Sequence, residues 1–167
     1  MSEEDEYPWQ EAEGQYKKLH VSLIDLEFVE HHARYLLTHE LFRGHEKGNE
    51  ELYKEQTAFV SALKVAYGRI FTTSKGLPHF PMRLTQYTEE EKKLHEKWLE
   101  DRNKLFAHSD ADSHRLFKSR TMVIRMTPMY HLNKSEVELI LVMAEKLRGA
   151  SVRRINEIDA AEAQRPR

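Results

Sequence analysis

Three residues with complementary chemistry lie within one short stretch of the chain. Arg102, Asn103 and His108 belong to the segment Arg102-Asn103-Lys104-Leu105-Phe106-Ala107-His108, which is followed by Ser109-Asp110. An arginine is permanently cationic and binds phosphate oxygens through its planar guanidinium, and a histidine exchanges protons near neutral pH. This combination predicts phosphoryl chemistry that needs no metal ion and no cofactor.

The three groups suit the cleavage of RNA. His108 would act as general base and remove the proton of a ribose 2′-hydroxyl. Arg102 would hold the scissile phosphate and stabilise the charge that builds on its oxygens, while Asn103 orients either partner by hydrogen bonds. Attack by the 2′-oxygen would leave a 2′,3′-cyclic phosphate. DNA lacks this hydroxyl and would not be cut.

The segment resembles the R-x(4-6)-H signature of the HEPN family (higher eukaryotes and prokaryotes nucleotide-binding), here as Arg102-x5-His108 with Asn103 after the arginine. The resemblance covers residues 19–160. It implies an all-α bundle and a metal-independent endoribonuclease of toxin–antitoxin or phage-defence type, with an antitoxin protein as a possible partner. It also implies a symmetric homodimer in which two motifs meet, so that a second His108 supplies the acid for the leaving group.

Helix geometry points to a composite site as well. Six residues of an ideal α-helix turn through about 600°, which places the side chains of Arg102 and His108 roughly 120° apart. The helix must therefore end between them, or a second subunit must contribute, for the two groups to act together.

A basic strip follows the motif. No acidic residue occurs between Ser113 and Ser135, although the formal net charge of the chain is −2. Local positive charge attracts phosphates even where the net charge does not. The residues that we expect to bind RNA are Lys104, Arg115, Lys118 and Arg120. The alternative is a solvated strand face without a ligand.

Two other interpretations remain open. In the first, Arg102 forms a structural ion pair with a glutamate near the ends of two neighbouring helices (Glu40, Glu50 or Glu51), and His108 only caps a helix. The chain would then be a catalytically silent module that binds a protein or a nucleotide. In the second, histidines of the first helix hold a metal ion in a bundle enzyme, because His32 and His39 lie two turns apart on one face. No histidine pair completes an H-E-x-x-H motif.

Composition favours one helical domain. The chain has 167 residues, of which 40% are hydrophobic and 32% charged, with few glycines and prolines. It has no cysteine, which excludes disulfides and thiolate metal sites. The N-terminus is acidic and the longest apolar run, 139–144, is too short to span a bilayer, so we expect a cytoplasmic protein that does not associate with a membrane.

Apolar spacing predicts the elements that position the motif. We expect a flexible acidic arm at 1–18, helices at 19–42 and 50–71, a third helix that opens at Thr88 with a Thr88/Glu91 capping box and carries the motif, and a strand or short hairpin at 115–127. A fourth helix begins with a Ser135/Glu138 cap and runs to about 158, before a disordered tail at 161–167. These elements predict an all-α, up-down antiparallel four-helix bundle at 19–160 with a short β-like insertion before the last helix.

Overall fold

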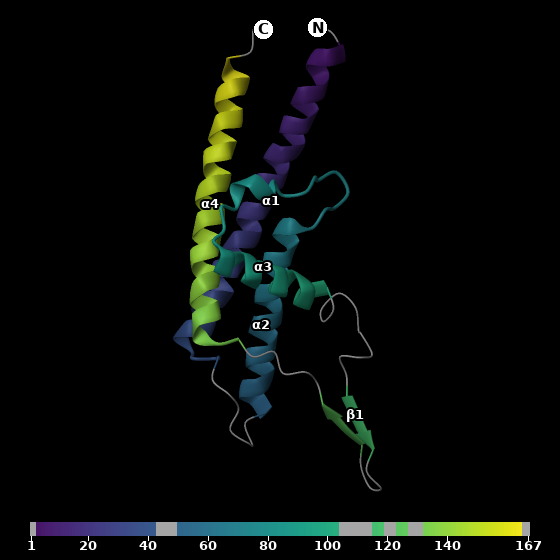
Figure 1. The fold of residues 1–167 in the computed structure, drawn as a ribbon, viewed down its shortest axis with the longest axis vertical. Coiled ribbons are helices and arrows are strands. Elements are labelled where there is room, and N and C mark those ends of the chain that lie inside the picture. Colours follow the sequence, from purple (N-terminus) through teal and green to yellow (C-terminus); the bar gives the residue numbers. More distant parts are fainter. Residues whose placement is uncertain (1–2, 43–49, 104–114, 119–122, 127–131, 165–167) are drawn as a thin grey trace.

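The computed structural model describes residues 3–42, 50–103, 115–118, 123–126 and 132–164. The elements in these ranges are α1 (Glu3–Thr38), α2 (Glu50–Phe71), a 3₁₀ turn η1 (Met82–Leu84), α3 (Glu89–Asp101), β1 (Arg115–Lys118), β2 (Val123–Met126) and α4 (Lys134–Ala163) (Figure 1). The all-α bundle with a β-like insertion before the last helix is confirmed. The bounds of α2 are those that its apolar stripe predicts.

The three long helices form the body of the bundle. Helix α1 runs antiparallel to α2 and to α4 (Figure 1), and Asp25 of α1 binds Arg69 of α2 at 3.0 Å. On the other side, Glu30 of α1 accepts a hydrogen bond from Arg148 Nε of α4 at 2.8 Å. The core between these helices consists of fully buried aliphatic and aromatic side chains, among them Leu19, Leu26, Leu36, Leu63, Tyr67, Ile70, Trp98, Ile140 and Leu147.

Helix α3 is short and lies across α2 and α4 instead of extending along them (Figure 1). Its acidic first turn and the Thr88/Glu91 capping box open it as the sequence predicts. It contacts α4 near its start and α2 near its end. The end of α3 therefore reaches the second half of α2, and this placement decides the surroundings of Arg102.

The first helix begins at Glu3, so residues 3–18 of the expected arm are helical. Lys18 is buried and donates hydrogen bonds to the backbone oxygens of Arg69 and Thr72 at the end of α2. Gln15 accepts a hydrogen bond from Arg154 Nε of α4 at 2.7 Å. Residues 15–18 of α1 thus have partners on α2 and α4 that a local sequence pattern does not reveal.

The cap of α4 also differs from the prediction. Asn133, not Ser135, is the N-cap: its side-chain oxygen accepts from the backbone N–H of Glu136 at 2.8 Å, and the Glu136 side chain accepts from the Asn133 N–H. Ser135 donates its hydroxyl to the same Asn133 oxygen at 2.6 Å. At the other end, α4 continues to Ala163, three residues into the expected tail.

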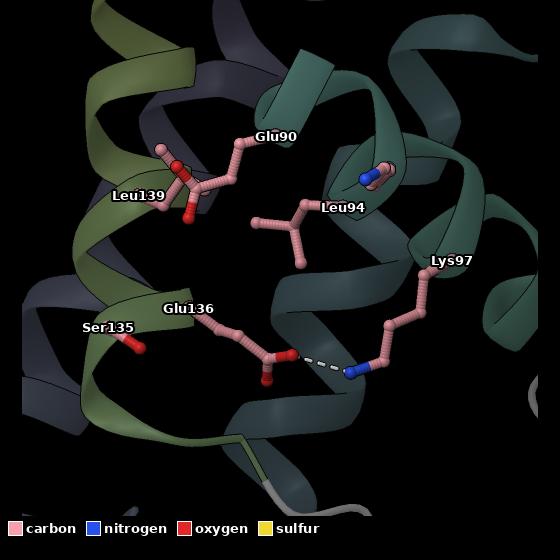
Figure 2. A pocket seen from close by; sticks show the side chains of 7 residues that line it. Glu90, Leu94, Lys97, Ser135, Glu136 and Leu139 are labelled. Atoms are coloured by element: carbon pink, nitrogen blue, oxygen red, sulfur yellow. Dashed lines mark hydrogen bonds and ion pairs between the residues drawn. The ribbon is translucent and has the colours of Figure 1, made fainter. Parts of the chain in front are cut away.

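The capping glutamates of α3 and α4 each form an ion pair with a lysine of the other helix. Glu91, the capping glutamate of α3, binds Lys146 of α4 at 2.6 Å. Glu136, the capping glutamate of α4, binds Lys97 of α3 at 2.5 Å (Figure 2). Each helix therefore supplies the cation that pairs with the other's capping carboxylate, and these reciprocal pairs hold the first half of α4 against α3.

The insertion between α3 and α4 contains an antiparallel hairpin. Arg115 pairs with Met126 and Lys118 with Val123, so the two basic residues lie at opposite ends of β1. None of the described helices combines the length and the apolarity needed to cross a bilayer.

Candidate functional site

Arg102 and Asn103 continue α3 in a π-helical turn, a local widening of the helix that is often found at functional sites. Arg102 is half-buried, and its Nη1 donates a hydrogen bond to Asn103 Oδ1 at 2.9 Å. The structure thus brings two of the expected catalytic residues together and leaves both within reach of solvent.

The ion pair that would make Arg102 purely structural is not observed. Among the residues that the structure describes, its guanidinium forms no ion pair with a carboxylate. The expected neighbours were Glu40, Glu50 and Glu51. Instead, the Arg102 side chain lies against Gly68, which is about 27 Å farther along α2 than Glu50 at 1.5 Å per residue. The oblique course of α3 is the reason.

The contact with Gly68 is unusually close. A Cβ atom added to this glycine would lie 2.9 Å from Cγ and 3.1 Å from Cδ of Arg102, closer than carbon atoms normally approach. Gly68 is buried in α2, and a glycine inside a helix costs about 0.5–1 kcal/mol relative to alanine. The absence of a side chain is therefore what lets the arginine stem rest on the backbone of α2. A glycine inside an apolar helical stripe is a signal in the sequence, but it does not tell which residue approaches it.

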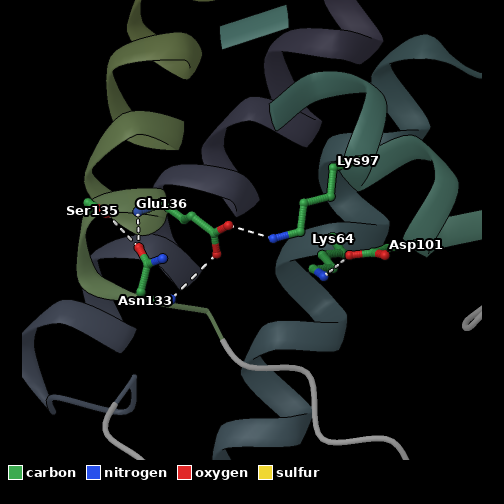
Figure 3. A network of polar contacts seen from close by, with 6 residues as sticks. All are labelled: Lys64, Lys97, Asp101, Asn133, Ser135 and Glu136. Atoms are coloured by element: carbon green, nitrogen blue, oxygen red, sulfur yellow. Dashed lines mark hydrogen bonds and ion pairs between the residues drawn. The ribbon is translucent and has the colours of Figure 1, made fainter. Parts of the chain in front are cut away.

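An ion pair one turn earlier on α2 anchors the same end of α3. Lys64 binds Asp101 (Figure 3), and its ammonium also lies 5.8 Å from the centre of the Trp98 ring. The Lys64 side chain is only 2% exposed. Burial lowers the pKa of Lys64 from its usual value, and the Asp101 carboxylate opposes this effect. Lys64 and Gly68 of α2 thus contact two consecutive residues of the α3 segment: Lys64 binds Asp101, and Gly68 lies against Arg102.

The remaining predicted site residues cannot be placed with this pair. His108, Lys104 and Arg120 lie outside the described residues, whereas Arg115 and Lys118 begin and end β1. The basic strip and the catalytic histidine therefore stay predictions.

The histidines considered as metal ligands have other contacts. His32 Nδ1 donates to the backbone oxygen of Phe28 at 2.6 Å, and the ring of His39 lies 4.1 Å from that of Tyr35. Within the described part of the chain, no three histidine or acidic side chains are grouped as a metal site would require. The geometry offers no support for a bundle metal centre there.

A buried polar cluster that the sequence did not predict lies beneath α3. Tyr67 of α2 has its hydroxyl 2.8 Å from His95 Nδ1 and 3.2 Å from the hydroxyl of Tyr87. Burial lowers the pKa of His95, and it raises the pKa values of both tyrosines. Because these three residues are buried among Phe71, Phe80 and Trp98, we interpret them as a structural contact between α2 and α3.

A small pocket lies between α3 and the start of α4 (Figure 2). It encloses about 220 Å³, less than the roughly 300–1,000 Å³ of typical ligand sites. Its cations Lys93 and Lys97 are balanced by Glu90 and Glu136. It therefore offers no strong attraction to an anionic substrate.

The Arg102–Asn103 pair therefore has three properties of an anion-binding group. Its guanidinium has no carboxylate partner among the described residues, it is held in place by Asn103 and Gly68, and it is accessible to solvent. Comparison of the chain with protein-family models, with curated proteins and with solved structures found no match.

Proposed function

We propose that the chain is a metal-independent endoribonuclease of HEPN type, acting as a cytoplasmic homodimer in a toxin–antitoxin or phage-defence system. One observation carries this proposal. The guanidinium of Arg102 is oriented by Asn103 and supported along its stem by α2, yet no carboxylate of the described residues neutralises it. An arginine held in this way is prepared to bind an anion.

The reaction follows from the side chains of the motif. His108 takes the proton of the 2′-hydroxyl, the 2′-oxygen attacks phosphorus, and the bond from phosphorus to the 5′-oxygen breaks. His108 of the partner subunit protonates the departing 5′-oxygen. Arg102 stabilises the charge on the non-bridging oxygens during this step. The products are a 2′,3′-cyclic phosphate and a free 5′-hydroxyl, and the atoms and charges balance without a metal.

One further feature supports this arrangement. An ideal helix would keep Arg102 and His108 on different faces, and the π-helical turn at Arg102 and Asn103 departs from that geometry at the start of the motif. Lys104, Arg115, Lys118 and Arg120 would contact the RNA backbone on either side of the scissile phosphate.

The test compares wild type with Arg102→Ala and His108→Ala on single-stranded RNA, with Arg83→Ala as a control at an exposed arginine of η1. Removing the proton-transfer group or the charge stabilisation should each slow cleavage on the order of 10²- to 10⁴-fold. The control should cut at the wild-type rate, and excess EDTA should change nothing. Mass spectrometry of the products should show the cyclic phosphate.

Stability separates this proposal from the silent module. Because Arg102 has no ion pair among the described residues, Arg102→Ala should change the melting temperature by only a few degrees, as expected for a loss of about 1 kcal/mol. A wild-type protein that never cuts RNA, together with an Arg102 variant that melts far lower, would contradict the ribonuclease and favour the binding module.

A further inference from the structure

Gly68 differs from the other glycines in the described residues. A Cβ added to Gly14 would meet Pro78 at an ordinary 3.6 Å, and one added to Gly149 would meet only the mobile end of Arg153 at 3.4 Å. At Gly76 it would meet nothing within 4 Å. At Gly68 alone among them, the added atom would lie inside contact distance of a side-chain stem, 2.9 Å from Cγ of Arg102.

The backbone of Gly68 needs no special conformation, since it continues the α-helical course of α2. Glycine is the poorest helix former after proline, so its use in the middle of a long, well-packed helix is unfavourable unless space is needed. The space is used by Arg102: both Cγ and Cδ of the arginine occupy the volume that any other side chain would fill.

Arg102 cannot avoid an added side chain by a small shift of α3. Asp101, its neighbour, is bound to buried Lys64, and His95 of the same helix is bonded to buried Tyr67. Both contacts precede the Gly68–Arg102 contact in α2 and in α3, and they fix the last two turns of α3 before Arg102 against α2. Relief must therefore come from rotation of the Arg102 side chain itself, which would carry the guanidinium away from Asn103.

We propose that Gly68 is a positioning residue for Arg102: its bare backbone sets the path of the arginine stem and thereby the place of the guanidinium beside Asn103. The role of this placement in RNA cleavage rests on the proposed function. The placement itself is a property of the fold and can be measured without any substrate.

The experiment introduces one methyl group, Gly68→Ala, and uses Gly149→Ala as the matched control in another long helix. Both changes raise helix propensity, but only the first meets the Arg102 stem. The first readout is the Nε–Hε resonance of Arg102 in ¹⁵N-labelled protein, assigned by its loss in Arg102→Ala. We expect it to shift or broaden in Gly68→Ala and to stay unchanged in Gly149→Ala.

The second readout is RNA cleavage. Since a displacement of about 1 Å in a positioned group lowers rates on the order of 10²-fold, we expect Gly68→Ala to lose roughly 10- to 100-fold, mainly in kcat and less in KM. Gly149→Ala should retain the wild-type rate.

The outcomes are distinguishable. An unchanged Arg102 resonance and full activity in Gly68→Ala would overturn the role of Gly68 and leave the ribonuclease standing. An inactive wild type would contradict the ribonuclease, while the resonance would still decide on Gly68. If Gly68→Ala unfolds, the double variant Gly68→Ala/Arg102→Ala should recover stability, because the stem that meets the new methyl group is gone. Failure to recover would overturn the inference.

Discussion

Replacing Lys146 with methionine should destabilise the protein through the carboxylate that it leaves behind. Glu91 is almost fully buried, with 3% of its side chain exposed, and it accepts hydrogen bonds from Lys146 Nζ and from the Thr88 N–H. Burial by itself raises the pKa of Glu91, but Lys146 and Thr88 outweigh this effect, so its pKa lies below the usual value. Methionine keeps most of the volume of Lys146 and removes the charge.

The magnitude follows from the burial of the partners. Breaking a buried ion pair costs about 3–5 kcal/mol because an uncompensated charge remains. Lys146 is 39% exposed and Glu91 keeps one donor, so we expect a loss of about 2–3 kcal/mol. For a chain of this size, this corresponds to a decrease in melting temperature of about 4–12 °C.

The matched control is Lys97→Met, which breaks the reciprocal pair. Glu136 is 19% exposed and Lys97 50% exposed, so the remaining carboxylate stays in contact with water and the loss should be at most about 1 kcal/mol. Thermal unfolding followed by circular dichroism at pH 7 measures both variants under the same conditions.

The effect should also depend on pH. Glu91 has a folded pKa below its unfolded value near 4.5, so its stabilisation is present above pH 4.5 and is lost as the pH falls through the folded pKa. In Lys146→Met, burial is less opposed and the folded pKa rises. Wild type and variant should therefore converge in stability at low pH. Equal losses in the two lysine variants, or a gap that persists at acid pH, would refute this reasoning.

Two further predictions concern a histidine and the assembly. Wild-type stability should decrease between pH 7 and pH 5, because burial lowers the folded pKa of His95 below the usual 6.5 and the unfolded chain takes up the proton first. His95→Gln should remove this part of the slope in chemical denaturation, and a slope that persists unchanged would show that other groups cause it. Sedimentation at micromolar concentration should show a homodimer of about 40 kDa, roughly twice the 19.8 kDa of the chain. A strictly monomeric species would exclude the composite site with two copies of His108.

The sequence predicted the helix bounds, the helix cap and the hairpin correctly where residues close together in the chain determine the structure. The apolar stripe of α2 predicts its bounds, and the Thr88/Glu91 capping box opens α3 as expected. The period-two pattern predicts a strand or short hairpin, and the structure shows a hairpin in which Arg115 pairs with Met126. In each case the residues that decide the structure are neighbours in the chain.

The sequence-based predictions failed where contacts between residues far apart in the chain determine the structure. Residues 15–18, expected to be part of an arm, lie within α1, where Lys18 bonds to the end of α2 and Gln15 accepts from Arg154 of α4. The expected neighbours of Arg102 were wrong because periodicity shows which face of α3 is buried but not the angle at which the helix crosses α2. The same angle brings Arg102 onto Gly68, a contact between residues 34 positions apart that no local pattern contains.

The reciprocal capping of α3 and α4 has a consequence for local opening. The backbone N–H groups of Glu91 and Glu136 are bonded to Thr88 and Asn133, and each capping glutamate is also paired with a lysine of the other helix. Loss of one docking contact therefore weakens both helix starts at once. In native-state hydrogen exchange, the first turns of α3 and α4 should gain protection as one cooperative unit and exchange with a common opening free energy, although they are far apart in the chain.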